Sequence, residues 1–137
     1  MTREELKKII PHREPMLLID EATLVEENHA VGSYHVQGDE WFLQGHFPQN
    51  PVVPGVMLCE MMAQAGAVLI MDKIKDSTPY FVGIKNVKFK NMVHPGDTLE
   101  IECSLTKTKP PFFFAEGKGY VDGKLAVCGE FSFVLVK

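Results

Sequence analysis

The sequence is poor in cysteine and in positive charge, and each shortage excludes a class of protein. Its three cysteines, Cys59, Cys103 and Cys128, form no CxxC pair, and their odd number argues against a disulfide framework. Reduced thiols favour a cytoplasmic location. The net charge is −4, from 14 basic and 18 acidic residues. A nucleic-acid-binding protein needs a basic surface that displaces counterions, so we expect no nucleic acid partner.

Long apolar segments are also lacking. Half of residues 1–10 are charged, so we expect no signal peptide. The most apolar stretch, Val52–Met71, contains Pro54, Glu60 and Gln64, and its uninterrupted part is too short to span a bilayer comfortably. We therefore expect no membrane association and interpret this stretch as a buried helix.

Sequence motifs for metal, nucleotide and redox chemistry are missing as well. The chain has no HExxH, zinc-type Cys/His spacing, P-loop, GxGxxG or GxSxG motif, so we expect no metal and no cofactor. Its 137 residues, 45% of them hydrophobic, suit one compact domain over residues 1–137.

The first part of the chain indicates a short helix and a hairpin. Thr2 and Glu5 have the spacing of a capping box, and Pro11 is expected to end that helix. Two extended runs, Met16–Glu26 and His29–Gln37, are joined by a short polar turn and predict an antiparallel pair.

The second part indicates one long helix followed by about four strands. A helix is expected over residues 56–74, and the small-residue row Ala115, Gly117 and Gly119 would let it lie close to the sheet. Asp122-Gly123 is a strong hairpin-turn signal. Strands are expected over residues 80–90, 98–107, 112–121 and 124–136. A helix on one face of an antiparallel sheet is an α+β fold.

Prolines at positions 48, 51 and 54 follow His46 at a spacing of three. This spacing predicts a stiff polyproline-like loop that holds the imidazole in place. An imidazole ionises near neutral pH and suits a general base, although a histidine in a loop is more often a structural hydrogen-bonding group. The other four histidines, His12, His29, His35 and His94, lie in polar or strand contexts and are set aside.

Glu60 is the one carboxylate within Val52–Met71, and Gln64 lies one turn further along the same face. An apolar environment favours the protonated carboxyl, which can give a proton to a leaving group. The alternative is that Glu60 emerges at the helix edge or pairs with a buried amide. At Gly55 the helix begins, and its first amides could bind a carbonyl oxygen that gains negative charge, or could simply mark the helix start.

Together, these features place a base, an acid and an oxyanion donor between positions 46 and 60. Removal of a proton next to a carbonyl, with loss of a β-hydroxyl, requires this set of groups.

The string from Gly45-His46-Phe47-Pro48 through Pro54-Gly55-Val56 to Glu60 and Gln64 resembles the 3-hydroxyacyl-[acyl-carrier-protein] dehydratases, most closely the FabZ-type branch. Pro11-His12-Arg13 and Pro95-Gly96-Asp97 are similar to flanking segments of that family. The resemblance implies a hot-dog fold, in which an antiparallel sheet wraps around one central helix. It also implies that His46 and Glu60 are the catalytic pair.

The same resemblance implies partners and further site residues. The Gly55 amide would hold the thioester carbonyl, and the other implied oxyanion or substrate-binding residues are Val56, Phe47, Pro54 and Gln64. The pair would form across a homodimer interface, with dimers grouped in threes as a homohexamer. The substrate would be an acyl group on the phosphopantetheine arm of acyl carrier protein, with no further cofactor. Candidates for docking this acidic carrier are Lys85, Lys88, Lys90, Arg3, Lys7, Lys8 and Arg13, unless they are ordinary solvated side chains.

Three alternatives remain open from the sequence. The dehydratase could also isomerise its enoyl product, which Glu rather than Asp at position 60 disfavours. The chain could be a hot-dog thioesterase, which would release a free thiol. It could also bind an acyl carrier without turnover, but a carboxylate in an apolar helix is costly unless it is satisfied or used. Bulky residues at Phe112-Phe113-Phe114 leave the preferred acyl length undecided.

Overall fold

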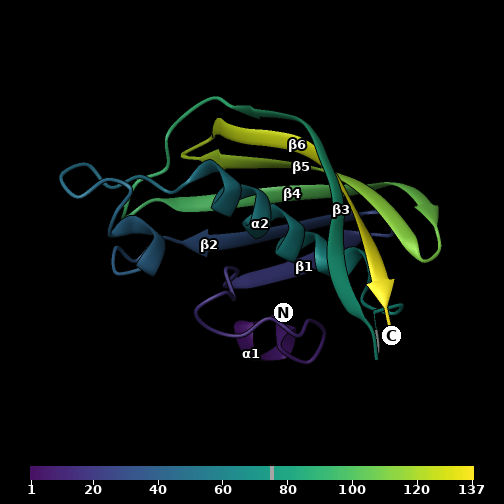
Figure 1. Cartoon of the computed structure of the whole chain (residues 1–137). Coiled ribbons are helices and arrows are strands. Elements are labelled where there is room, and N and C mark those ends of the chain that lie inside the picture. The colour runs from purple at the N-terminus through teal and green to yellow at the C-terminus, as the bar shows by residue number, and fades with distance from the viewer. Residues whose placement is uncertain (75) are drawn as a thin grey trace.

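The structure, a computed structural model, describes residues 1–74 and 76–137 and shows a curved antiparallel sheet wrapped around one helix (Figure 1). The strand order is β1-β2-β4-β5-β6-β3. The elements in chain order are α1 (Arg3–Leu6), β1 (Glu21–Glu26), β2 (His29–His35), the 3-10 helix η1 (Trp41–Leu43), α2 (Gly55–Gly66), the 3-10 helix η2 (Ala67–Ile70), β3 (Thr78–Phe89), β4 (Thr98–Lys109), β5 (Phe112–Val121) and β6 (Lys124–Val136). The predicted α+β class is confirmed.

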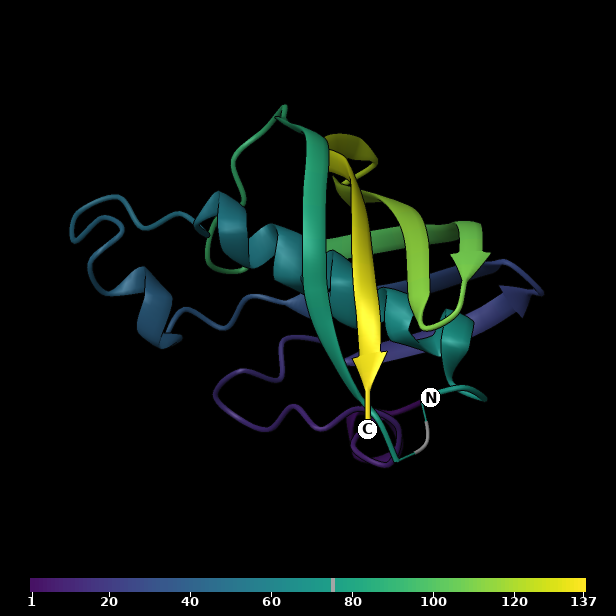
Figure 2. The same cartoon turned by 45° about the vertical axis from the view of Figure 1, so that its right-hand side comes forward.

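Helix α2 lies against the concave face of the sheet, and the strands curve around it (Figure 2). Alternate residues of β4, Leu99, Ile101 and Cys103, point inward and are at most 1% exposed. The helix approaches closely where the sheet has no side chain. A Cβ atom on Gly117 would lie 3.1 Å from the sulfur of Met62 in α2. The small-residue row therefore serves the close helix packing that its composition predicts, with Gly117 as the contact point.

The hairpins follow the turn signals of the sequence. β5 and β6 have the predicted bounds, and Asp122 and Gly123 between them have φ angles of 50° and 79°. Two consecutive residues in the left-handed region form the tight turn that matches the twist of paired strands. All three cysteines are free, with Cys59 and Cys103 buried.

Several predicted boundaries are wrong. β2 ends at His35 rather than Gln37, β3 spans Thr78–Phe89 rather than residues 80–90, and β4 extends to Lys109 rather than ending at residue 107. The long helix is α-helical only to Gly66 and continues as the tighter η2 to Ile70, because glycine weakens the α-helix at the junction. α1 ends at Leu6, well before Pro11. The segment 16–20 is not a strand, because the Gln64 side chain binds the backbone of Met16 and Leu18.

The two edges of the sheet are β1 and β3, and β3 is paired only with β6. Five large apolar side chains of β3 are between 40% and 56% exposed, namely Tyr80, Phe81, Val82, Ile84 and Phe89. Edge strands in soluble proteins usually carry charges or are covered. No helix within residues 1–74 and 76–137 combines the length and the apolarity needed to cross a membrane.

Candidate active site

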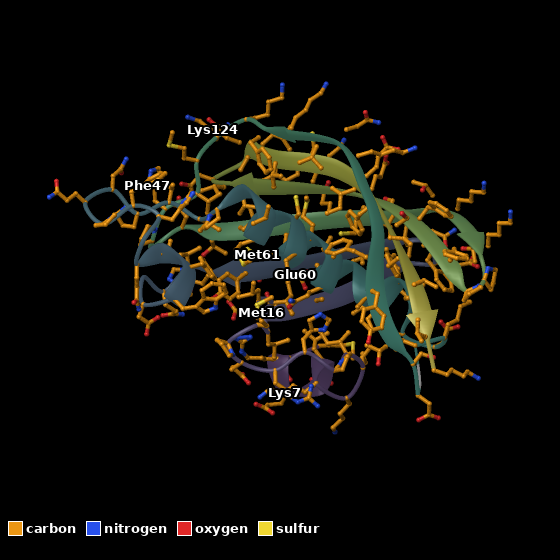
Figure 3. The ribbon with its side chains drawn as sticks, viewed as in Figure 1. Lys7, Met16, Phe47, Glu60, Met61 and Lys124 are labelled. Carbon is orange, nitrogen blue, oxygen red and sulfur yellow. The ribbon has the colours of Figure 1, made fainter. Side chains whose placement is uncertain are left out.

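Glu60 lies in the middle of α2 on the side that faces the N-terminal segment, and its side chain is 17% exposed. Figure 3 shows it next to Met16, below the helix. Its Oε2 atom accepts a hydrogen bond of 2.8 Å from Nε2 of Gln64. Glu60 is therefore paired with the buried amide of Gln64 through one carboxylate oxygen. This pairing is one of the alternatives that the sequence left open.

Gln64 is 2% exposed, and its side-chain amide makes three hydrogen bonds. Its Oε1 accepts from the Leu18 backbone N–H at 2.7 Å, and its Nε2 donates to the Met16 carbonyl at 2.8 Å as well as to Glu60. These bonds fix the orientation of the amide, because a flipped amide would present oxygen to two acceptors. Gln64 therefore ties α2 to the segment 16–18 and orients the carboxyl group of Glu60.

His12 is a third member of this cluster and was missed from the sequence. Its Nε2 atom lies 3.3 Å from Oε2 of Glu60, and both residues line the same pocket. His12 has polar neighbours in the sequence, which do not indicate a catalytic setting. The available signal was its place in Pro11-His12-Arg13, one of the segments that carry the family resemblance.

His46 lies on the loop between η1 and α2, and backbone hydrogen bonds close this loop. The Val52 N–H donates to the His46 carbonyl at 2.9 Å, and Phe47 and Asn50 exchange backbone bonds of 3.0 and 3.3 Å. The loop is therefore turned back on itself, and the expected extended polyproline-like form is wrong. Hydrogen bonds between backbone groups on either side of the turn hold the loop in this form.

The imidazole of His46 is half-buried and held in a defined tautomer. Its Nδ1 atom lies 3.0 Å from the Val52 carbonyl oxygen, which can only accept a hydrogen bond, so Nδ1 carries the proton. The lone pair of Nε2 is then available to take a proton. The Phe47 ring stacks on the imidazole with a centroid distance of 4.3 Å and itself remains 54% exposed.

The start of α2 is shaped by Pro54, Gly55 and Val56. The Pro54 carbonyl accepts from the backbone N–H groups of Met57 and Leu58, while the amides of Gly55 and Val56 precede the first helical acceptor. A Cβ atom at position 55 would lie 2.7 Å from the Phe89 ring. Glycine is therefore needed here for close packing against β3, in addition to any role of its amide.

A largely apolar pocket runs along α2 from Glu60 and His12 toward the end of η2. Ala63 of α2 and Ala67 of η2 are small and leave room for this pocket. Gln64 and Tyr80 contribute its other polar groups. The apolar lining residues are Ile10, Ala63, Ala67, Ile70, Ile74, Pro79, Phe81 and Phe133.

Two buried thiols lie on or against α2, Cys59 within the helix and Cys103 bonded to the Met62 carbonyl, and burial sets their pKa values. It raises the pKa of the Cys59 thiol next to Glu60, and the neighbouring carboxylate charge acts in the same direction. Burial also raises the pKa of Cys103 to about 12. Both thiols therefore stay protonated at neutral pH and are poor nucleophiles.

Within one chain the structure does not bring His46 and Glu60 together. The contacts of Glu60 are with His12 and Gln64, whereas His46 contacts Val52 and Phe47. Figure 3 shows Phe47, the neighbour of His46, on a loop that projects away from Glu60. The predicted catalytic pair therefore cannot act within a single protomer in this arrangement.

Most of the N-terminal cations proposed for docking have local partners. Arg3 donates to the carbonyls of Leu17 and Ile19, and Arg13 donates to three backbone carbonyls of its own segment. Lys7 pairs with two glutamates. The lysines at 85, 88 and 90 are exposed on or just after β3.

Comparison with solved structures identifies the fold class. The dehydratase heterocomplex ApeI:P from Xenorhabdus doucetiae matches with a TM-score of 0.82 and 26% identity, covering 96% of this chain and 91% of that chain. The PaaI protein of the E. coli phenylacetic acid degradation operon matches with a TM-score of 0.66 and 15% identity, over 96% of this chain and 88% of that chain. The predicted hot-dog fold is confirmed.

Sequence comparison then identifies the family. A model of the FabA-like domain matches residues 10–130, and the chain belongs to the FabA-like family. The 3-hydroxyacyl-[acyl-carrier-protein] dehydratase FabZ of Clostridium perfringens is 43% identical over 137 residues, covering 98% of this chain and 99% of the relative. That of Clostridium beijerinckii is 46% identical over 136 residues, covering 96% of each. The predicted enzyme class, a FabZ-type dehydratase, is confirmed by these similarities.

Proposed function

We propose that this protein dehydrates (3R)-3-hydroxyacyl groups on acyl carrier protein to trans-2-enoyl groups in type II fatty acid synthesis. The observation that carries the proposal is the position of Glu60 at one end of a largely apolar pocket. An acyl chain suits such a pocket, and a carboxyl group at its end can reach a hydroxyl near the thioester. The names of the relatives support the substrate class.

His46 is the base in this proposal. Its Nδ1–H is bound to the Val52 carbonyl, so the Nε2 lone pair can remove a proton from C2 of the substrate. The electrons of the broken C–H bond delocalise into the thioester carbonyl. The free amide of Gly55 at the start of α2 hydrogen-bonds this oxygen and stabilises its negative charge, with the positive end of the helix dipole behind it.

Glu60 is the acid. Its protonated carboxyl group gives a proton to the 3-hydroxyl group, the C3–O bond breaks, and a water molecule leaves as the C2–C3 double bond forms. His46 then holds the proton taken from C2, and Glu60 is ionised. Proton exchange with solvent returns both groups to their starting states, so the reaction needs no cofactor.

The separation of His46 from Glu60 within one chain requires a second chain to complete the site. The apolar outer edge of β3 is suited to this, because a second copy pairing along it would cover Tyr80, Phe81 and Val82. The base then comes from one subunit and the acid from the other. We expect three such dimers to form the hexamer.

The carrier protein is acidic, so we propose that it docks on the exposed Lys85, Lys88 and Lys90. The N-terminal cations Arg3, Lys7 and Arg13 are less suitable, because each is bound to groups of its own chain. A cytoplasmic location fits the free cysteines.

Subunit complementation tests this proposal. His46→Ala and Glu60→Gln variants should each be inactive when the enoyl thioester is followed by its absorbance. When the two variants are co-expressed in equal amounts, half of the dimers are mixed and each mixed dimer has one intact site. Activity should return to about one quarter of the wild-type value.

Differently tagged variants show whether subunits have mixed. No recovery in a preparation whose tags co-purify would refute the shared site, and full activity of either single variant would refute the mechanism. Release of a free thiol from the substrate, measured in parallel, would indicate a thioesterase instead.

A further inference from the structure

Two side-chain nitrogens lie close to one oxygen of Glu60, and one of them is hydrogen-bonded to it. Gln64 Nε2 lies 2.8 Å from Oε2, and His12 Nε2 lies 3.3 Å from the same atom. Within residues 1–74 and 76–137, no hydrogen bond reaches Oε1 of Glu60. Gln64 lies one turn along the same helix, whereas His12 comes from the segment between α1 and β1, so the carboxyl group is held from two directions.

The environment of His12 indicates which ring nitrogen carries its hydrogen. Nδ1 of His12 is buried, and no group in the described part of the chain lies within hydrogen-bond reach of it. A hydrogen on Nδ1 would be a buried donor without an acceptor, both in the charged ring and in the Nδ1–H tautomer. The surroundings of Nδ1 therefore favour a hydrogen on Nε2, the ring nitrogen that faces Glu60 at 3.3 Å.

We propose that His12 is a positioning residue for the acid of this enzyme. Gln64 donates a hydrogen bond to Oε2 and Nε2 of His12 faces the same atom, so the proton that Glu60 delivers is held on Oε1. A proton on Oε2 would take the lone pair that faces one of these two nitrogens. The carboxyl group is thereby presented to the substrate through one defined oxygen.

This inference rests on the proposed function, because it assigns His12 a role only if Glu60 is the acid. A purely structural role for His12, as a space-filling ring between the N-terminal segment and α2, is the alternative. The two differ in one respect. A positioning role requires the N–H donor, whereas a space-filling role requires only the volume.

The near-isosteric pair His12→Gln and His12→Met separates these roles. Glutamine keeps an N–H donor within reach of Oε2, and methionine has similar volume without a donor. We expect His12→Met to lower kcat about 10-fold, with KM changed less than twofold, because the lost N–H no longer stabilises the Glu60 carboxylate that forms as the proton leaves. His12→Gln should keep kcat within about threefold of the wild type. His29→Met, on β2 and bonded to Ser104, is the matched control and should keep full activity.

Equal kcat values for the glutamine and methionine variants would overturn the inference. Full activity of Glu60→Gln would overturn the proposed function itself, whereas an inactive Glu60→Gln beside a fully active His12→Met would overturn only the role of His12. If His12→Met does not fold, ¹⁵N shifts of the histidine-labelled wild-type enzyme decide. The Nε2–H tautomer of His12 at neutral pH is expected, and the Nδ1–H tautomer or an imidazolium would contradict the proposal.

Discussion

The surroundings of Glu60 and the loop of His46 hold their side chains in different ways. Glu60 is bound by side chains, with Gln64 tied in turn to the backbone at Met16 and Leu18. His46 is bound through backbone groups, since its ring contacts the Val52 carbonyl and its own carbonyl accepts from Val52. The first region lies inside the protomer, and the second projects from it (Figure 3).

This difference indicates that the two halves of the proposed site contribute differently to folding. The hydrogen bonds around Glu60 satisfy buried polar groups, so they are part of what keeps α2 and the N-terminal segment together. The His46 side chain is half-buried on a loop and satisfies no buried group other than the Val52 carbonyl. A substitution around Glu60 should therefore change both activity and stability, whereas a substitution of His46 should change activity alone.

The largest expected effect is on turnover at His46. We expect His46→Ala to lower kcat about 10²- to 10⁴-fold, because the general base is lost. Its free energy of unfolding should change by less than about 0.5 kcal/mol, as for a surface substitution. Enoyl absorbance and urea unfolding measure the two quantities. A stability loss above about 1 kcal/mol would show that the loop is not independent of the core.

The rate of thiol labelling compares how accessible the two regions are to solvent. Cys59 beside Glu60 is 7% exposed and its thiol pKa is raised by burial. At Gly45 beside His46, by contrast, no atom of the described residues other than its chain neighbours lies within 4 Å of an added Cβ atom. We expect the cysteine of a Gly45→Cys variant to react with iodoacetamide at pH 8 about 100-fold faster than Cys59, because a buried thiol reacts only after local opening. Peptide mass spectrometry resolves the two sites.

Labelling in urea is the control, since both thiols should then react at similar rates. Comparable rates in the folded protein would mean that the Glu60 region opens as readily as the loop.

A substitution of Gln64 should affect stability more than any change on the loop. Gln64→Leu leaves the Leu18 N–H and the Met16 carbonyl without their partner, and we expect a loss of about 2–4 kcal/mol in the free energy of unfolding. Gln44→Leu changes the same residue type at an exposed position before His46 and should have an effect near zero. Similar urea midpoints for the two variants would contradict the comparison.

A smaller loss of stability than at Gln64 is expected where the two regions meet, at the start of α2. In Gly55→Ala the new methyl group would lie 2.7 Å from the Phe89 ring, which is half-exposed and can turn away. We expect a loss of about 1 kcal/mol in stability. Phe89→Leu in the same chain should restore part of it, and a double-mutant cycle measures the coupling. Additive effects would show that the ring does not constrain position 55.

Local signals in the sequence predicted much of the sheet. Asp122-Gly123 and the alternation on either side of it predicted β5 and β6 with their bounds, because a two-residue turn fixes the register of both strands. A separate alternation of apolar and polar residues in β4 placed Leu99, Ile101 and Cys103 in the core. Gly117 predicted close helix packing because glycine alone leaves room for a neighbouring side chain.

Long-range contacts were not predictable in the same way. The sequence placed Glu60 and Gln64 on one face, but nothing local indicated that Gln64 binds segment 16–18 and so prevents a strand there. His12 was missed for the same reason, since its contact with Glu60 depends on how the N-terminal segment folds back onto α2. The proline spacing after His46 suggested an extended loop, whereas paired backbone groups turn it back.

The position of β3 at the edge, next to β6, has a consequence for synthesis on the ribosome. β3 lies in the middle of the chain, but among the described strands its one neighbour in the sheet is β6, which is translated after β4 and β5. Until β6 emerges, the apolar residues of β3 have no strand on either side, and the nascent chain needs protection from aggregation. Limited proteolysis of ribosome-bound chains that stop before Lys124 should therefore cleave within β3, and protection of β3 in such chains would contradict this order of assembly.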